Sequence, residues 1–344
     1  MAKKVRLADI ADKVGVSVVT VSKALSGQKG VSEEMRERIC ALARELGYRQ
    51  PSVERREAER KSFHLGVIIH EGYLDKYASF YWQMYQNVSR TLMEEGSFCF
   101  LEILDEDTEL DPVIPKLVSE QKVDGLIFVG TISEDYLAYI SENVKLPQIY
   151  IDFTDKDHRT DAVISDSFYG AYHVTNHLFD MGHTRIAYVG TVLTTGSITD
   201  RYLGYLKSLM EHGVQVREDW VIPDREKASG HIDPEGLKLP EEMPTAFFCN
   251  CDLTASMVIK RLQKMGYRVP EDISVAGYDN YIYPGLCDVE ITSYEVDMAE
   301  MARVAVDVIL KKIAGESYRH GVHIVEGHLV IKESVAHVTG GQSL

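Results

Sequence analysis

Residues 7–48 carry three short helical patterns, and this stretch constrains more than any other what the chain can fold into. Each pattern has apolar residues at helical spacing, and the three sets are Leu7, Ile10, Ala11 and Val14; Thr20, Val21, Ala24 and Leu25; and Met35, Ile39, Leu42 and Leu46. Gly15 and Gly47 end the first and third helices, and Ser17 and Ser32 can cap the second and third. Two short helices joined by a tight turn, with a third packed across them, form a helix-turn-helix unit.

The second helix of such a unit lies in the DNA major groove, where its first residues face the edges of the bases. The candidate DNA-binding residues here are Ser17, Val18, Val19, Thr20, Ser22 and Lys23. Valine methyl groups suit the methyl group of thymine, and the Lys23 ammonium suits O6 and N7 of guanine. The alternative is a small three-helix core with no role in nucleic-acid binding.

The charge of the chain is divided unevenly between its first 61 residues and the rest. Residues 1–61 hold 14 Lys and Arg against 9 Asp and Glu, whereas residues 62–344 hold 23 against 44. A surface that binds phosphate must be positive, and DNA repels an acidic one. We therefore expect any contact with nucleic acid to be made by the first 61 residues.

From His64 onward, short apolar runs typical of β-strands alternate with longer helical stretches. The eight runs are HLGVIIH, FCFLEIL, VDGLIFVG, LPQIYID, DAVIS, TRIAYVG, TAFFCNC and ISVAGYD. Apolar strands that alternate with helices indicate parallel sheets covered on both faces. Eight runs are many for one open sheet, and a second series begins after about Ser165, so the pattern predicts two similar α/β halves.

The sequence resembles the lactose/galactose repressor (LacI/GalR) family. The resemblance is carried by VGVSVVTVSKAL, VSEEMRERI and ELGYR near the start of the chain. It continues in VISDSFYGAYHVTNHLFDMGHTRIAYVG, TDRYLGY, TAFFCNCDLTAS and GYRVPEDISVAGYDN. It implies a multi-domain α and α/β protein, in which an N-terminal helix-turn-helix head precedes a periplasmic-binding-protein-like effector domain of two α/β subdomains.

The same resemblance predicts where the domains begin and end. The head is expected at residues 1–49, a hinge or linker at 50–62 and a loose tail at 338–344. The effector N-subdomain is expected to combine residues 63–163 with 293–319, and the C-subdomain 164–292 with 320–337.

The hinge departs from the family pattern. In the family this segment is a helix that folds on the operator and inserts a pair of leucines into the minor groove. Here the leucine position falls on Glu57 or Ala58, and neither side chain unstacks bases well. Arg55 and Arg56 remain candidates for DNA binding through phosphate, whereas the departure weakens the expectation of a strongly kinked operator.

The candidate ligand-binding residues follow the predicted strands. Ligands of open α/β sheets bind beyond the carboxyl ends of the strands, which here places them between the two halves. The resemblance implies effector contacts for Asp152, Arg201 and Asp279, and the strand end TAFFC adds Asn250 and Cys251. The family often has asparagine at the position of Cys251. Carboxylates together with arginine bind the hydroxyl groups of polyols well, which favours a sugar as the effector.

Several of these positions also have an ordinary structural explanation. Asp252 is more typical of a cap on the following helix than of a ligand contact. Asp279 and Asn280 could simply form a turn, and Arg201 could lie at the surface or bridge the two subdomains.

Six aromatic residues lie within 13 positions after the first strand, namely Tyr73, Tyr77, Phe80, Tyr81, Trp82 and Tyr85. Aromatic faces stack on sugars or purines, and tyrosine hydroxyls remain free to hydrogen-bond. The family places its aromatic pair that lines the cleft at Phe80 and Tyr81, which are therefore candidate ligand-binding residues. We expect Trp82 and Tyr85 in a dimer interface or in the core.

The sequence predicts no catalytic residue, no metal and no cofactor. Cys249 and Cys251 lack a second pair of cysteines or histidines at zinc spacing, and His173 and His177 lack the glutamate of a metalloprotease motif. No nucleophile elbow, P-loop or dinucleotide-binding glycine motif is present, so we do not expect an enzyme. No apolar run is long enough to cross a membrane and no signal peptide is seen, which predicts a cytoplasmic protein with no membrane partner.

Together these observations predict a homodimeric, ligand-responsive transcription regulator, most simply a repressor of sugar-utilisation genes. Two heads would read the half-sites of a pseudo-palindromic double-stranded DNA operator, and a small-molecule effector would bind between the subdomains. One alternative is a regulator controlled by a partner protein, with a non-functional ligand cleft. Another is a solute-binding protein, against which the attached head argues.

Overall fold

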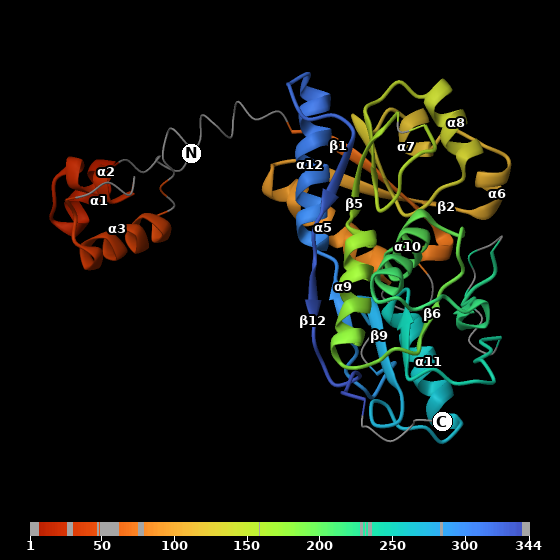
Figure 1. The fold of residues 1–344 in the computed structure, drawn as a ribbon. Coiled ribbons are helices and arrows are strands. Elements are labelled where there is room, and N and C mark those ends of the chain that lie inside the picture. Colours follow the sequence, from red (N-terminus) through yellow and green to blue (C-terminus); the bar gives the residue numbers. More distant parts are fainter. Residues whose placement is uncertain are drawn as a thin grey trace. The chain divides into compact units, whose positions relative to one another are not determined.

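The computed structural model describes residues 7–25, 30–46, 48, 62–74, 79–157, 159–227, 230, 232, 236–282 and 285–338. Contacts divide the chain into two compact units, Met1–Ser62 and Phe63–Leu344. We call the first unit the head and the second the body (Figure 1).

The head contains the three predicted helices, α1 (Leu7–Val14), α2 (Val18–Leu25) and α3 (Glu33–Glu45). Their apolar stripes meet in one core, with Ile10, Ala11, Val21, Ala24, Ile39 and Ala43 buried. The two predicted caps are present, because Ser17 Oγ accepts from the Thr20 amide at 3.1 Å and Ser32 Oγ from the Met35 amide at 3.4 Å. The predicted helix-turn-helix fold is confirmed.

The described residues of the body form two six-stranded sheets, and each of the eight predicted strands is present. The first sheet consists of β1 (His64–His70), β2 (Phe98–Leu104), β3 (Gly125–Val129), β4 (Gln148–Ile151), β5 (Asp161–Ser165) and β11 (Val322–Val325). Its strands are all parallel, in the order β11-β5-β4-β3-β1-β2. The second sheet consists of β6 (Ile186–Val189), β7 (Val221–Ile222), β8 (Ala246–Cys249), β9 (Ser274–Asp279), β10 (Thr292–Glu295) and β12 (His328–Val330). Its order is β12-β10-β9-β8-β6-β7, and only β12 runs antiparallel.

Helices cover both faces of each sheet, as the apolar strands predicted. The first sheet is flanked by α5 (Phe80–Glu94), α6 (Glu106–Leu110), α7 (Lys116–Ser119), α8 (Glu134–Asn143) and α12 (Met298–Ala314). The second is flanked by α9 (Ser167–Asp180), α10 (Gly196–Glu211) and α11 (Asp252–Lys264), and two short 3-10 helices are η1 (Glu71–Tyr73) and η2 (Glu218–Trp220). In β1, Val67 and Ile69 pack with α5, whereas Ile68 packs on the opposite face with Phe128 of β3. This alternation buries both faces of the strand.

Helices α9 and α10 pack closely because of one glycine. A Cβ atom on Gly204 of α10 would lie 2.1 Å from the carbonyl oxygen of Phe168 on α9. No larger residue fits there without moving one helix. The contact fixes α10, and with it Arg201 one turn earlier on the same helix.

The chain crosses between the two sheets three times, a few residues later than the sequence predicted. The predicted borders fell after residues 163, 292 and 319. However, β5 stays in the first sheet through Ser165, and β10 lies in the second sheet through Glu295. Strand β11 pairs with β5 in the first sheet, so the predicted place of residues 322–325 in the C-subdomain is wrong. An apolar strand pattern does not show which sheet supplies its hydrogen-bond partner, which explains the error.

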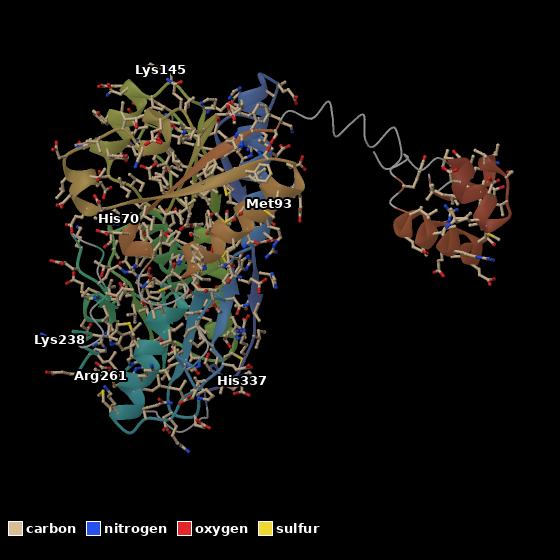
Figure 2. The ribbon with its side chains drawn as sticks, turned by 180° about the vertical axis from the view of Figure 1, so that it is seen from behind. His70, Met93, Lys145, Lys238, Arg261 and His337 are labelled. Carbon is tan, nitrogen blue, oxygen red and sulfur yellow. The ribbon has the colours of Figure 1, made fainter. Side chains whose placement is uncertain are left out.

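The view from behind shows how the two halves of the body are arranged (Figure 2). Lys145, between α8 and β4, marks the end of the first half, and Arg261 on α11 marks the end of the second. His70, the last residue of β1, lies between them. The carboxyl end of this strand is therefore directed toward the second half.

Candidate functional sites

Helix α2 of the head presents the residues that the sequence predicted for DNA binding. Val18 and Val19 are 44% and 64% exposed, and Ser17, Ser22 and Lys23 are also exposed. Thr20 is half-buried, with its hydroxyl 2.9 Å from that of Ser17. Val21 and Ala24 face the core, so one side of α2 anchors the helix while the other remains at the surface. The predicted DNA contacts of Arg55 and Arg56 fall outside the described residues.

Asp152 and Tyr81 form the first half of a buried polar group between the two sheets. Asp152 follows β4 directly and is 8% exposed, and the Tyr81 hydroxyl donates to its Oδ2 at 2.9 Å. Burial raises the pKa of the Asp152 carboxyl, whereas the charge of Arg201 opposes this rise. Arg201 belongs to the other half, so its charge acts on this carboxylate from across the two halves.

Arg201 and Asp279 form the second half of this group. Arg201 is 5% exposed, and its Nη2 lies 3.1 Å from Oδ1 of Asp279, at the end of β9. Its Nη1 donates to the carbonyl oxygen of Asn250 at 2.6 Å, and the guanidinium lies 3.8 Å from the centre of the Tyr278 ring. Burial raises the pKa of Asp279 to about 6, in spite of the opposing charge of Arg201. We call Tyr81, Asp152, Arg201 and Asp279 the inter-sheet cluster.

Aromatic rings form one wall beside this cluster. Tyr73 and Tyr81 are 4.4 Å apart between ring centres, and Phe80 meets Tyr81 edge-on at 5.2 Å. Phe80 also approaches Tyr281 of the other half at 6.5 Å. The structure places Phe80 beside Tyr81, whose hydroxyl donates to Asp152, and the contact of these two rings with a ligand stays a prediction. Trp82 stacks instead on Tyr85 and is 37% exposed, and Tyr77 lies outside the described residues.

The strand ends that carry the two aspartates adopt unusual backbone conformations. Asp152, Asp279 and Asn280 have φ angles of +69°, +95° and +48°, in a region that non-glycine residues rarely occupy. Such strain persists where the surrounding contacts determine the conformation. Asp279 is the last residue of β9 and forms an ion pair with Arg201, whereas the bend begins at Asn280.

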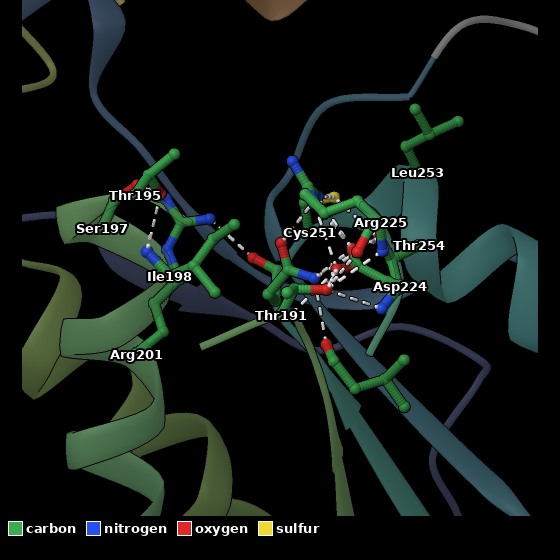
Figure 3. Close-up of polar contacts among 12 residues, drawn as sticks. Thr191, Thr195, Ser197, Ile198, Arg201, Asp224, Arg225, Cys251, Leu253 and Thr254 are labelled. Carbon is green, nitrogen blue, oxygen red and sulfur yellow. Dashed lines mark hydrogen bonds and ion pairs between the residues drawn. The ribbon is translucent and has the colours of Figure 1, made fainter. Parts of the chain in front are cut away.

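A second polar network surrounds Asp224, just after β7 (Figure 3). Oδ2 of Asp224 accepts from Arg225 Nη2 at 2.8 Å, from Thr254 Oγ1 at 2.7 Å and from Asn250 Nδ2 at 2.7 Å. Its Oδ1 accepts from the amide of Thr191 at 2.9 Å. These donors hold the pKa of Asp224 down, at about 2, although its burial acts in the opposite direction.

The segment from Asn250 to Asp252 departs from the sequence expectations. The Asn250 side chain is 1% exposed and lies in the Asp224 network rather than in the inter-sheet cluster. Cys251 is the N-cap of α11 but its thiol makes no capping bond, and Asp252 is the first helical residue. Oδ2 of Asp252 accepts from the Tyr281 amide at 2.9 Å. The predicted cap by Asp252 is therefore wrong, because its side chain is directed at the chain that follows β9.

Comparison with known proteins covers both units. Residues 6–51 match the family described as bacterial regulatory proteins of the lacI family, and residues 175–335 match a periplasmic binding protein-like domain. The HTH-type transcriptional repressor PurR of Aliivibrio salmonicida is 27% identical over 329 residues, which are 95% of this chain and 98% of that protein. PurR of Pectobacterium carotovorum is 27% identical over 333 residues, 95% and 96% of the two chains.

The chain belongs to the lactose/galactose repressor family. It is accordingly a ligand-responsive, DNA-binding transcription regulator.

Solved structures of this family share the fold. The CelR–cellobiose complex has a TM-score of 0.66 and 22% identity, and covers 96% of this chain and 100% of that one. The lac repressor dimer bound to operator and the anti-inducer ONPF has a TM-score of 0.63 and 22% identity, and covers 97% and 100%.

The sequence did not predict a place in the site for Asp224, Arg225 or Tyr281. The first two follow β7, a strand of only two residues, Val221–Ile222, which gives no recognisable apolar run. Without a predicted strand there was no predicted strand end. A Pro-Asp-Arg sequence shortly after a tryptophan was the only available indication.

Metal sites and membrane spans are both absent from the part of the chain that the structure describes. It contains no group of three His, Cys, Asp or Glu residues placed to hold a metal ion. No described helix is long and apolar enough to span a membrane.

Proposed function

We propose that the chain is a homodimeric repressor whose body binds a small, hydroxyl-rich effector, a sugar or sugar derivative, at the inter-sheet cluster. The observation that carries this proposal is the buried ion pair of Arg201 with Asp279 in one half, together with a buried Asp152 in the other half whose carboxyl the Arg201 charge influences. We place the protein in the cytoplasm and assign it no catalytic role.

The chemistry of the cluster supports a polyol ligand. Two carboxylates accept from hydroxyl groups, and the guanidinium donates to hydroxyl oxygens. The rings of Phe80 and Tyr81 supply a flat apolar wall of the kind that stacks on a sugar. One solved relative of similar fold, CelR, is described in complex with cellobiose.

The position of the cluster supports regulation by this ligand. Its residues come from both halves, so a bound ligand contacts both sheets only when they are close together. A ligand shifts such an equilibrium by its difference in affinity for the two states. In a homodimer this shift would change how well two heads fit two half-sites of an operator.

A DNA-binding experiment tests the role of the head. The full chain would be used to select an operator from random double-stranded DNA, and binding of wild type and Lys23→Ala would be compared on it. We expect Lys23→Ala to lower specific affinity by about 1–3 kcal/mol, because it removes the charged side chain that reads base edges. Lys122→Ala, an exposed lysine of the body, should leave affinity unchanged. Unchanged preference for the selected operator in Lys23→Ala would refute this docking of α2.

A melting experiment tests the role of the body. Wild type and Asp152→Asn would be melted with mono- and disaccharides, sugar phosphates and purines. At a hundredfold excess over Kd a ligand should stabilise the wild type by about 2.7 kcal/mol, and the variant much less. If none of these compounds raises the melting temperature while operator binding is intact, control by a partner protein is favoured. This is the alternative that the sequence left open.

A further inference from the structure

Arg225 is held firmly near the inter-sheet cluster but keeps one nitrogen available. Its Nε donates to Oδ1 of Asp224 at 3.1 Å and its Nη2 to Oδ2 at 2.8 Å. Nη2 also donates to Oδ1 of Asn250 at 3.1 Å. No described residue accepts a hydrogen bond from Nη1, and the Arg225 side chain is only 15% exposed. A largely buried guanidinium therefore retains unused donors.

The carboxylate that pairs with Arg225 is already saturated. Asp224 accepts from the amide and hydroxyl of Thr191, from the amide nitrogen of Asn250 and from the hydroxyl of Thr254, besides Arg225. Its negative charge is thus shared with several neutral donors. The far edge of the Arg225 guanidinium stays electropositive as a result.

Arg201 approaches the same segment from a different element and also has an unused donor. Arg201 binds the main-chain oxygen of Asn250, whereas Arg225 binds the side-chain oxygen of the same residue. Figure 3 shows both arginines reaching toward the segment that carries Cys251. The Nε of Arg201 is buried without a hydrogen-bond partner, in a residue that is 5% exposed. A buried donor of this kind costs free energy until an acceptor reaches it.

The amino end of α11 adds main-chain donors at this point. The helix has 13 residues, and its N-cap, Cys251, makes no side-chain capping bond. The Cys251 sulfur lies 3.8 Å from Nη2 of Arg225, so the uncapped helix end and the guanidinium are neighbours. First-turn amide groups and the helix dipole favour negative charge.

Donors from two arginines and from the amino end of α11 are therefore brought together around Cys251, beside one buried acceptor without a described partner, Oδ1 of Asp252. The side-chain donors without a described partner are Arg225 Nη1 and Arg201 Nε, and the first turn of α11 adds its main-chain amides. We infer that the effector carries an anionic group, a phosphate or a carboxylate, that binds between Arg225 and the amino end of α11, with Arg201 at its side. This inference rests on the proposed function and deepens it, since it assigns the charge of the effector that the inter-sheet cluster binds.

Matched pairs of ligands test the inference on the full chain. Glucose would be compared with glucose 6-phosphate and glucuronate, and adenosine with AMP, by calorimetric titration and by melting. Inorganic phosphate would be compared with chloride at equal ionic strength. We expect an anionic member of at least one pair to bind about tenfold or more tightly than its neutral partner, because charge-assisted hydrogen bonds are roughly twice as strong as neutral ones. The phosphate and carboxylate arms show which anion is preferred.

Variants show whether Arg225 causes this preference. Arg225→Gln should reduce the ratio of anionic to neutral affinity toward one, and Arg225→Lys should retain part of it. Arg217→Gln, which removes an exposed arginine paired with Asp219 and Glu242, should leave the ratio unchanged. The ratio is compared within one variant, so a general loss of stability does not mimic the result.

Three outcomes would overturn the inference. First, a neutral ligand that binds as tightly as its anionic partner would overturn the inference, but it would leave the proposed effector site intact. A preference for anions that survives in Arg225→Gln would place the anion elsewhere. Absence of any stabilisation by the anionic ligands or by inorganic phosphate would also overturn it, and a flat response to the neutral ligands as well would count against the proposed function.

Discussion

The carboxyl ends of the strands of the two sheets lie toward each other in the body, but the side chains at these ends differ in their chemistry. The first sheet contributes one carboxylate, Asp152, and a wall of aromatic rings that includes Tyr81. The second contributes two buried arginines, Arg201 and Arg225, each paired with an aspartate. The two halves have the same type of α/β fold, but the first supplies a wall of aromatic rings and the second supplies charged arginines.

This difference indicates which side chains of the site contribute most to the free energy of unfolding. A buried charge depends strongly on its partner, whereas an aromatic ring packs against many neighbours and loses only part of its contacts when one changes. We therefore expect substitutions at the second edge to have larger effects than substitutions at the first. Three measurements test this order.

The largest effect is expected at Arg201. Arg201→Met leaves Asp279 buried without its cation, and should lower the free energy of unfolding by about 3–5 kcal/mol in a denaturant titration. Arg268→Met removes an exposed arginine from its pair with Asp272, and should cost no more than about 1 kcal/mol. Equal losses of the free energy of unfolding in the two variants would mean that the buried ion pair contributes no more to stability than the exposed one.

The next effect concerns the pH dependence that Asp279 produces. Its pKa in the folded protein is about 6 against an ordinary value of 3.8, so the protonated carboxyl favours the folded state. Stability from this group is therefore present at low pH and is lost as pH rises from about 4 to above 6. Relative to Asp279→Asn, the wild type should lose about 2 kcal/mol between pH 4 and pH 7 in unfolding titrations. A pH-independent difference between the two proteins would contradict the assignment.

The smallest effect is expected at the first edge. Tyr81→Phe removes the hydroxyl that donates to Asp152, and should reduce the free energy of unfolding by about 1–2 kcal/mol. Tyr172→Phe removes an exposed hydroxyl that donates to Glu211, and should change it by less than about 0.5 kcal/mol. A loss at Tyr81 as large as that at Arg201 would reverse the proposed contrast between the two edges.

The fold could be predicted where the local pattern was long and periodic. The head followed from apolar spacing and two serine caps, and the eight strands followed from apolar runs bounded by polar residues. The crossing points were less predictable, because β11 has the same appearance whether it pairs with β5 or with a strand of the other sheet. Pairing is a long-range property that local pattern does not contain.

The candidate site was predictable only in part, for a similar reason. Asp152 and Asp279 end strands that are visible in the sequence, so their meeting could be anticipated from sheet geometry. Arg225 follows a strand of two residues, and its importance comes from a network of side chains far apart in the chain. Asp252 looked like a cap, but the chain after β9 offers it a main-chain donor at Tyr281 that competes with the helix end.

The three crossings between the sheets have a mechanical consequence. The connectors after β5, β10 and β11 are only one or two residues long, and the amide of Asp166 in the first donates to Val325 at the start of the third at 3.0 Å. Short connectors that run side by side, two of them joined by a hydrogen bond, permit one sheet to rotate against the other about a single axis. They resist an independent twist of either sheet. The head is attached through Phe63 to β1 alone, so the first sheet is the only covalent route from the body to the head. We therefore expect a displacement of the second sheet to reach the first sheet as a rotation about these connectors.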